Sequence, residues 1–194
     1  MRAQAIVKRG IDIGLCLLSS PIAVPLCILL LFAIRIETSG SPLFIQARVG
    51  RGGKPFRMFK LRTMLADTMS LPSHDVCVSR ITRVGKLLRI LKLDELPQIL
   101  NVLVGSMSLV GPRPCLVTQA AVIEARREMG VLDYRPGITG PAQLQGVDMS
   151  EPLLMAQIEA AYFSRATIWS DFRLLIQTFT GGGRGDAALR RSRG

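Results

Sequence analysis

A long apolar stretch near the N-terminus constrains this chain more than any other feature of its sequence. From Ile11 to Ile34 the residues are apolar apart from Asp12 and the pair Ser19-Ser20. As one straight helix this stretch would be about 36 Å long, which is enough to cross a bilayer. We therefore expect residues 1–36 to form a membrane-embedded helical segment.

Prolines and flanking charges favour a helix that enters the bilayer and leaves on the same face. Pro21 and Pro25 each remove a backbone donor and bend a helix, and the hydroxyls of Ser19 and Ser20 can bond the carbonyls freed there. Both flanks are basic, whereas a spanning segment normally has its positive excess on the cytoplasmic side only. We expect a re-entrant hairpin, helix-break-helix, that bends at Ser20-Pro21. A kinked spanning helix stays open, and a cleaved signal peptide is disfavoured because no small-residue cleavage site follows.

The composition of the whole chain fits a basic domain held against a membrane. Its 194 residues allow one domain with a sizeable core. Hydrophobic residues make up 48% of the chain, yet the formal net charge is +11, and 20 of the 25 cations are arginines. The planar fork of arginine suits phosphate groups and anionic lipid headgroups. We expect an α+β fold with a helix-rich domain at 37–180 and a disordered basic tail at 181–194.

Local patterns predict the elements of that domain. Residues 41–46 and 56–62 are strand-like and are separated by a basic turn. Helices are expected at residues 81–90, 95–103 and 116–129, and one or two more at 151–180. In the last range, aromatic side chains beside arginines fit an amphipathic helix at a membrane interface, and packing of that helix on the core stays open. Residues 65–79 are predicted to be a polar loop carrying His74, and the four cysteines lack metal-ligand spacing, so free thiols are expected.

The adjacent carboxylates Asp94 and Glu95 are the strongest candidates for chemistry. Taken alone they are typical of a helix N-terminus, with Asp94 as the capping residue of the helix at 95–103. Their context differs, because cations that could bind phosphate lie at nearby strand ends, helix turns and loop corners. These cations are Lys60, Arg62, Arg89, Arg113 and Arg135. The pattern indicates that the two carboxylates act on a phosphate-containing substrate.

Three ordered motifs carry a resemblance. They are Phe59-Lys60-Leu61-Arg62-Thr63-Met64, the run from Arg89 through Asp94-Glu95-Leu96-Pro97-Gln98 to Gly111-Pro112-Arg113-Pro114, and Arg135-Pro136-Gly137-Ile138-Thr139-Gly140. Together they resemble the bacterial sugar transferase family, the monotopic polyprenyl-phosphate phosphoglycosyl transferases. The similarity runs from Lys8 to about residue 180, and the chain looks like the small catalytic unit of that family, without the spanning helices of larger members. It differs at Pro141-Ala142-Gln143, where the family usually has Trp-Ala-Gln, and in a hairpin a few residues shorter before its Ser-Pro pair.

The resemblance implies a reaction and its participants. Asp94 would attack the phosphate attached to the sugar of a UDP-sugar, so that UMP leaves and a phosphosugar–aspartyl intermediate remains. Polyprenyl phosphate, such as undecaprenyl phosphate, would then attack that intermediate to give a polyprenyl diphosphate sugar. This would be the first membrane step of a glycan such as an exopolysaccharide or lipopolysaccharide. Magnesium would be bound by Asp94 and Glu95.

The resemblance also assigns the remaining site residues and the location. The five cations above would neutralise phosphate oxygens, and Pro112, Thr139 and Gln143 would contact the nucleotide sugar. The enzyme would be monotopic, with its active site at the cytoplasmic face of the bacterial inner membrane, and a homodimer is left open. No nucleic-acid partner is expected, because the aromatics are few and not interleaved with the basic residues. The alternatives are a membrane-anchored nucleic-acid binder and an inactive membrane scaffold, and no physical signature identifies the sugar.

Overall fold

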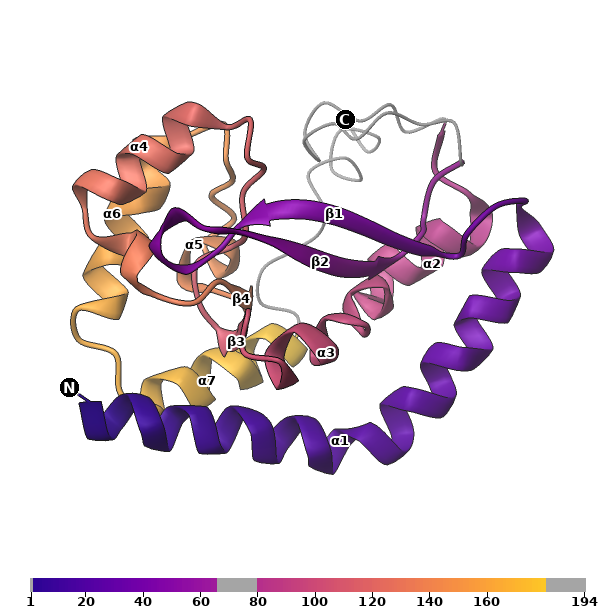
Figure 1. Cartoon of the computed structure of the whole chain (residues 1–194), viewed down its shortest axis with the longest axis horizontal. Helices are drawn as coiled ribbons and strands as arrows, with labels where there is room; N and C mark the ends of the chain where they lie inside the picture. The colour runs from indigo at the N-terminus through magenta and orange to yellow at the C-terminus, as the bar shows by residue number, and fades with distance from the viewer. Residues whose placement is uncertain (1, 66–79, 181–194) are drawn as a thin grey trace.

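The computed structural model describes residues 2–65 and 80–180 (Figure 1), so the predictions for His74 and for the tail at 181–194 lie outside the described residues. The helices are α1 (Arg2–Glu37), α2 (Arg83–Leu91), α3 (Gln98–Leu103), α4 (Ala120–Glu128), α5 (Pro141–Leu144), α6 (Pro152–Phe163) and α7 (Ile168–Phe179). The strands are β1 (Leu43–Val49), β2 (Pro55–Leu61), β3 (Ser108–Val110) and β4 (Gly137–Thr139). Short 3-10 turns are η1 (Arg51–Gly53), η3 (Leu93–Glu95) and η4 (Val131–Asp133). The expected mixture of helices and short strands is confirmed.

The helix α1 runs without interruption from Arg2 to Glu37 and bends in its middle (Figure 1). Pro21 lacks the backbone N–H that would donate to the carbonyl of Leu17, four residues earlier in the helix. The hydroxyl of Ser20 donates to that carbonyl instead, over 2.8 Å. The expected helix-break-helix is therefore a bent continuous helix, because a serine side chain replaces the backbone bond that proline removes. Among the described residues, this is the one helix long and apolar enough to cross a membrane.

The N-terminal part of α1 is attached to the domain by polar contacts. Lys8 forms an ion pair with Asp171 of α7, and the buried carboxylate of Asp12 accepts a hydrogen bond from the Ser108 hydroxyl of β3 over 2.7 Å. Tyr162 of α6 donates to the same Asp171 over 2.8 Å. A buried carboxylate needs such partners, so these contacts hold the first turns of α1 against β3 and α7.

The C-terminal part of α1 is attached to the same domain by a second set of contacts. Ile34 is buried against Leu61 of β2 and Leu88 of α2. The carboxylate of Glu37 accepts hydrogen bonds from the backbone N–H groups of Arg83, over 2.7 Å, and Val84, over 3.1 Å. These are unpaired N–H groups of the first turn of α2, so Glu37 stabilises the start of that helix. The middle of α1 lies between the two attachments and has an exposed apolar surface.

The strands β1 and β2 form an antiparallel hairpin that η1 closes. The predicted strands are confirmed, although β1 begins two residues later and ends three residues later than expected. The free edge of β2 bonds to the buried side chain of Asn101 in α3, which accepts from the N–H of Phe59 over 3.0 Å and donates to the carbonyl of Arg57 over 2.7 Å. Asn101 therefore replaces a third strand and fixes α3 against the hairpin.

The short strands β3 and β4 form a parallel pair that the sequence patterns did not predict. Their backbones meet at Gly111 and Gly137. A Cβ atom on Gly111 would lie 2.2 Å from the carbonyl oxygen of Arg135, and one on Gly137 would lie 2.1 Å from the backbone nitrogen of Gly111. Only glycine allows this approach, which brings the two Pro/Gly-rich loops into direct contact.

The helices α4 and α6 pack at the opposite end of the hairpin from α2 (Figure 1). The helix α4 begins four residues later than predicted, and residues 151–180 form the two helices α6 and α7. On α7 the side chains of Trp169 and Phe172 are exposed and stack on each other, with ring centroids 5.8 Å apart. The position of this helix at a membrane interface stays a prediction.

Candidate active site

The Asp94-Glu95 pair lies in η3, between α2 and α3. Lys92 ends α2 in the left-handed conformation, with φ 56°, and turns the chain into η3. The N-cap position of α3 is Pro97, which has no capping side chain. The prediction that Asp94 caps a helix starting at Glu95 is therefore wrong, because a 3-10 turn separates the pair from α3.

Lys60 of β2 reaches both carboxylates. Its Nζ lies 3.2 Å from Glu95 Oε1 and 3.9 Å from Asp94 Oδ2. The exposed fractions of these side chains are only 21% for Lys60, 13% for Asp94 and 17% for Glu95, so water and salt screen their charges less than at an open surface. The structure thus brings Lys60 and the two carboxylates together, as predicted.

Surrounding cations keep Glu95 ionised. Burial raises the pKa of its carboxyl, but the charges of Lys60, Arg113 and Lys92 and the hydrogen bond from Lys60 lower it by more, so the pKa lies below the ordinary range. The charge of Arg113 places this predicted residue of the loop after β3 within electrostatic reach of the carboxylates. A carboxylate that cations keep ionised can act as a nucleophile or bind a metal ion, but cannot donate a proton at neutral pH.

Arg48 of β1 is a site residue that the sequence patterns did not single out. Its Nη1 donates to the carbonyl of Pro114 over 3.1 Å, next to Arg113. Burial and the nearby charge of Arg113 lower the pKa of Arg48 to about 10, and the charge of Glu95 opposes this shift. Alternate residues of a strand share a face, so Arg48 would have been predicted on the same face as Lys60 if the register of β1 and β2 had been known.

Two of the predicted phosphate ligands bind other parts of the protein. Arg62 is buried, and its Nη2 donates to the Thr38 hydroxyl over 2.6 Å, at the end of α1. Arg135 donates through Nε to the carbonyl of Gly105 over 2.9 Å. That carbonyl follows the C-terminal end of α3, whereas the carboxylates precede its N-terminal end, so the structure does not bring Arg135 to them.

Arg89 lies in the last turn of α2, five residues before Asp94. Its Nε donates to the hydroxyl of Thr63 over 2.9 Å. This contact holds α2 to the end of β2. A phosphate-binding role for Arg89 stays a prediction.

A family model described as bacterial sugar transferase matches residues 3–183 of the chain. The chain belongs to the bacterial sugar transferase family. It is 38% identical over 182 residues to a protein of Caulobacter vibrioides named UDP-glucose:undecaprenyl-phosphate glucose-1-phosphate transferase, covering 88% of this chain and 67% of that one. It is 34% identical over 186 residues to a protein of Aeromonas hydrophila named UDP-N-acetylgalactosamine-undecaprenyl-phosphate N-acetylgalactosaminephosphotransferase. That match covers 90% of this chain and 43% of the Aeromonas protein. A protein of Escherichia coli named for the same glucose reaction is 33% identical, and the chain spans 39% of its length.

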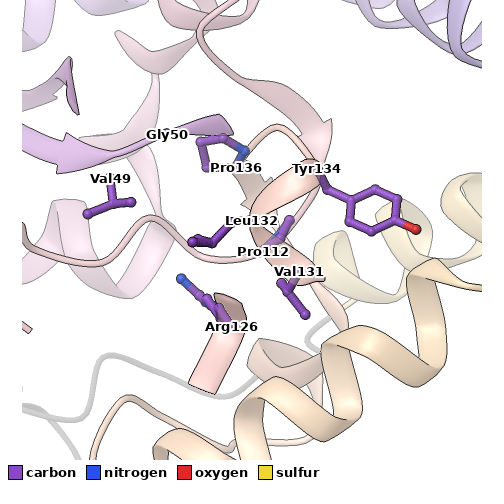
Figure 2. Close-up of a pocket in the computed structure, with 8 residues that line it drawn as sticks. All are labelled: Val49, Gly50, Pro112, Arg126, Val131, Leu132, Tyr134 and Pro136. Carbon is purple, nitrogen blue, oxygen red and sulfur yellow. The ribbon is translucent and has the colours of Figure 1, made fainter. Parts of the chain in front are cut away.

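In this member of the family, the predicted nucleotide-sugar residues lie in or just after the strands β3 and β4. Pro112 lines a hollow with Val49, Leu132 and Arg126, whose nitrogen-bearing end points toward Val49 (Figure 2). The cavity volume of this hollow is about 10 Å³, whereas typical ligand pockets enclose roughly 300–1,000 Å³. It is therefore too small to hold a nucleotide sugar.

Thr139 and Gln143 have different environments. Thr139 is buried, with its Oγ1 2.8 Å from the hydroxyl oxygen of Thr178 in α7. That contact fixes α7 to β4. Gln143 lies in α5, which begins at Pro141, and its Oε1 is buried without a hydrogen-bond partner. An unpaired buried acceptor is costly, so Gln143 has a free bonding position.

The two carboxylates fit a magnesium ion only together with a substrate. Among residues 2–65 and 80–180, no group of three or more His, Cys, Asp or Glu side chains could hold a metal ion. Magnesium is, however, commonly bound through one or two carboxylates plus substrate phosphates. Asp94 and Glu95 supply two adjacent carboxyl groups beside Lys60, so the residues present fit the ion.

Proposed function

We propose that this chain transfers a sugar 1-phosphate from a UDP-sugar to undecaprenyl phosphate or a similar polyprenyl phosphate, and releases UMP. The observation that carries this proposal is the pair Asp94 and Glu95, half-buried beside Lys60 and within reach of the charge of Arg113. The relatives are named for this reaction with glucose or with N-acetylgalactosamine. Because their named sugars differ, we leave the sugar of this chain open.

The proposed reaction has two steps on one phosphorus atom. An oxygen of Asp94 attacks the phosphorus attached to the sugar, and the bond from that phosphorus to the bridging oxygen breaks as UMP leaves with its electron pair. A phosphate oxygen of the polyprenyl phosphate then attacks the same phosphorus, and the bond to Asp94 breaks. Lys60 and Arg113 offset the repulsion between a carboxylate and the anionic phosphates.

Magnesium would be held by Asp94 and Glu95 together with substrate phosphate. When bound, the ion neutralises phosphate charge. Lys60 already lies 3.2 Å from Glu95, so part of the positive charge around this carboxylate comes from the protein itself. Chelation that stops product formation, reversed by added magnesium, would support this assignment.

Purified protein in detergent, given a UDP-sugar, magnesium and undecaprenyl phosphate, should release UMP. The assay uses a panel of UDP-sugars, and chromatography separates UMP from UDP. UMP release that requires the acceptor for multiple turnovers supports the two-step reaction. Release of UDP would contradict it and indicate direct sugar transfer instead.

We further propose that α1 is re-entrant and that both of its ends lie on the cytoplasmic side of the inner membrane. Support comes from its two attachments, through Lys8 and Asp12 at one end and through Glu37 at the other, to one domain. A domain on one side of a bilayer can hold both ends only if the helix returns to that side. The exposed apolar middle of α1 would then enter the lipid, with α7 at the interface.

Cysteine labelling tests this topology. In a variant without the native cysteines, Ala5→Cys and Ser39→Cys should both react with an impermeant maleimide in inside-out vesicles, and neither in intact spheroplasts. Ile22→Cys, in the bend, should resist the reagent from both sides. Labelling of Ala5→Cys and Ser39→Cys from opposite sides would indicate a spanning helix.

A further inference from the structure

The guanidinium of Arg48 is held rigidly by neutral acceptors. Its Nε and Nη2 both donate to Gln46 Oε1, over 3.0 and 2.6 Å, and its Nη1 donates to the carbonyl of Pro114 over 3.1 Å. These bonds use three of the five N–H groups of an arginine. They fix the orientation of the group without neutralising its charge.

The register of the hairpin places Arg48 on the same face as Lys60. Lys60 pairs with Phe44, and Arg48 pairs with Phe56. Cross-strand partners share a face and alternate residues along a strand share a face, so Lys60, Gln46 and Arg48 point to one side of the hairpin. The two cations are separated by about 13 Å along the strands, and both have long side chains that can approach a ligand between them.

The loop after β3 contributes a third cation, Arg113. The bond to Pro114 ties Arg48 to the residue that follows Arg113, and Arg113 is within electrostatic reach of both Arg48 and Glu95. We call Lys60, Arg113 and Arg48 the row of cations, in which Lys60 lies beside the carboxylates and Arg48 lies about 13 Å further along the hairpin. The charge of Arg113 lowers the pKa of Arg48 by more than the charge of Glu95 raises it. An anionic ligand beside Arg48 would relieve this repulsion, and the neutral hydrogen-bond partners of Arg48 do not supply such a charge.

We propose that Arg48, oriented by Gln46, binds the phosphate of the leaving UMP, while Lys60 and Arg113 lie nearer the phosphate that Asp94 attacks. This inference rests on the proposed function, because it assigns the two phosphates of a UDP-sugar to two ends of one row of cations. A fixed guanidinium fork suits a phosphate that gains charge as its bond to the bridging oxygen breaks. Arg48 is then a phosphate-binding residue and Gln46 is its positioning residue.

Direct binding of UMP, measured by equilibrium dialysis with purified protein, tests the inference. Arg48→Met should weaken UMP binding by about ten- to a hundredfold, the loss expected for hydrogen bonds to a charged group. Arg48→Lys, which keeps the charge but not the fork, should show a smaller loss. The half-saturating concentration of undecaprenyl phosphate should not change. The control is Arg51→Gln, which removes a cation at the tip of the same hairpin. This variant should bind UMP like the wild type.

Gln46→Glu separates substrate binding from structural bracing. The new carboxylate can keep both bonds to Arg48 while neutralising its charge. Reduced UMP affinity with an unchanged or higher melting temperature supports the proposal. Unchanged UMP affinity in both Gln46→Glu and Arg48→Lys proteins overturns it, and makes Arg48 a brace between β1 and Pro114.

The experiments distinguish a failure of the proposed function from a failure of this inference. If the wild type releases UDP in place of UMP, the reaction is wrong, whereas UMP binding that depends on Arg48 would still locate a nucleotide phosphate. If the wild type releases UMP and the Arg48 variants bind UMP normally, only the inference is wrong.

Discussion

Asp94→Asn protein should fold normally and release UMP at least about 1,000-fold more slowly than the wild type. The amide has the same shape as the carboxylate but no negative charge, so it cannot form the bond to phosphorus. Its effect on stability should stay within about 1 kcal/mol, because the amide fills the same space and the ion pair of Asp94 with Lys60 is long, at 3.9 Å. The measurements are UMP release and the melting temperature in detergent.

A matched substitution and a chemical trap sharpen this prediction. Asp133→Asn changes an exposed aspartate in η4 and should leave UMP release intact. With a UDP-sugar and no acceptor, mass spectrometry of wild-type peptides should find a phosphosugar on Asp94. An adduct on Glu95, or full activity of Asp94→Asn, would make the assignment of the nucleophile wrong. Unchanged glycan output in cells carrying Asp94→Asn would favour a scaffold.

Arg126→Met should lower the free energy of unfolding by about 3–5 kcal/mol, because it leaves the carboxylate of Glu159 buried without its partner. The pair joins α4 to α6 through two bonds, from Nε to Oε2 over 2.8 Å and from Nη2 to Oε1 over 2.7 Å. Both side chains are at most 3% exposed. Thermal unfolding in detergent, with each sample at the same protein and detergent concentration, measures the loss.

Two further variants show whether the buried charge is the cause. Adding Glu159→Met to Arg126→Met should restore most of the lost stability, because no uncompensated charge remains. Arg127→Met removes an exposed partner of Glu124 on the same helix and should change stability by no more than about 0.5 kcal/mol. Equal losses for Arg126→Met and the double variant would mean that packing, and not charge, determines the effect.

Helices and strands with strong local patterns were predictable, and those stabilised by distant contacts were not. The apolar stretch, the hairpin of β1 and β2, and the pair of helices at 151–180 follow from periodicity and turn residues. The strands β3 and β4 have three residues each, too few for a periodic pattern. They exist because Gly111 and Gly137 let two remote loops meet backbone to backbone.

The candidate site divides in the same way. The Asp94-Glu95 pair and Lys60 were identified from sequence, and the structure brings them together. Arg62 and Arg135 had the same charge and similar loop or strand-end positions, yet they bind Thr38 and Gly105. A sequence reports which side chains are cationic, but it does not report which backbone carbonyl each one meets after folding.

The sequence by itself determined that this chain has a bent apolar helix and two adjacent carboxylates among cations, because periodicity, proline and charge act on near neighbours. The tertiary structure decided which cations reach those carboxylates. Lys60 and Glu95 are 35 positions apart, and Arg48 and Pro114 are 66 positions apart. The tertiary structure also put Asp94 in a 3-10 turn and not at a helix cap. Contacts of this kind depend on strand register and loop packing, which are set by the whole fold.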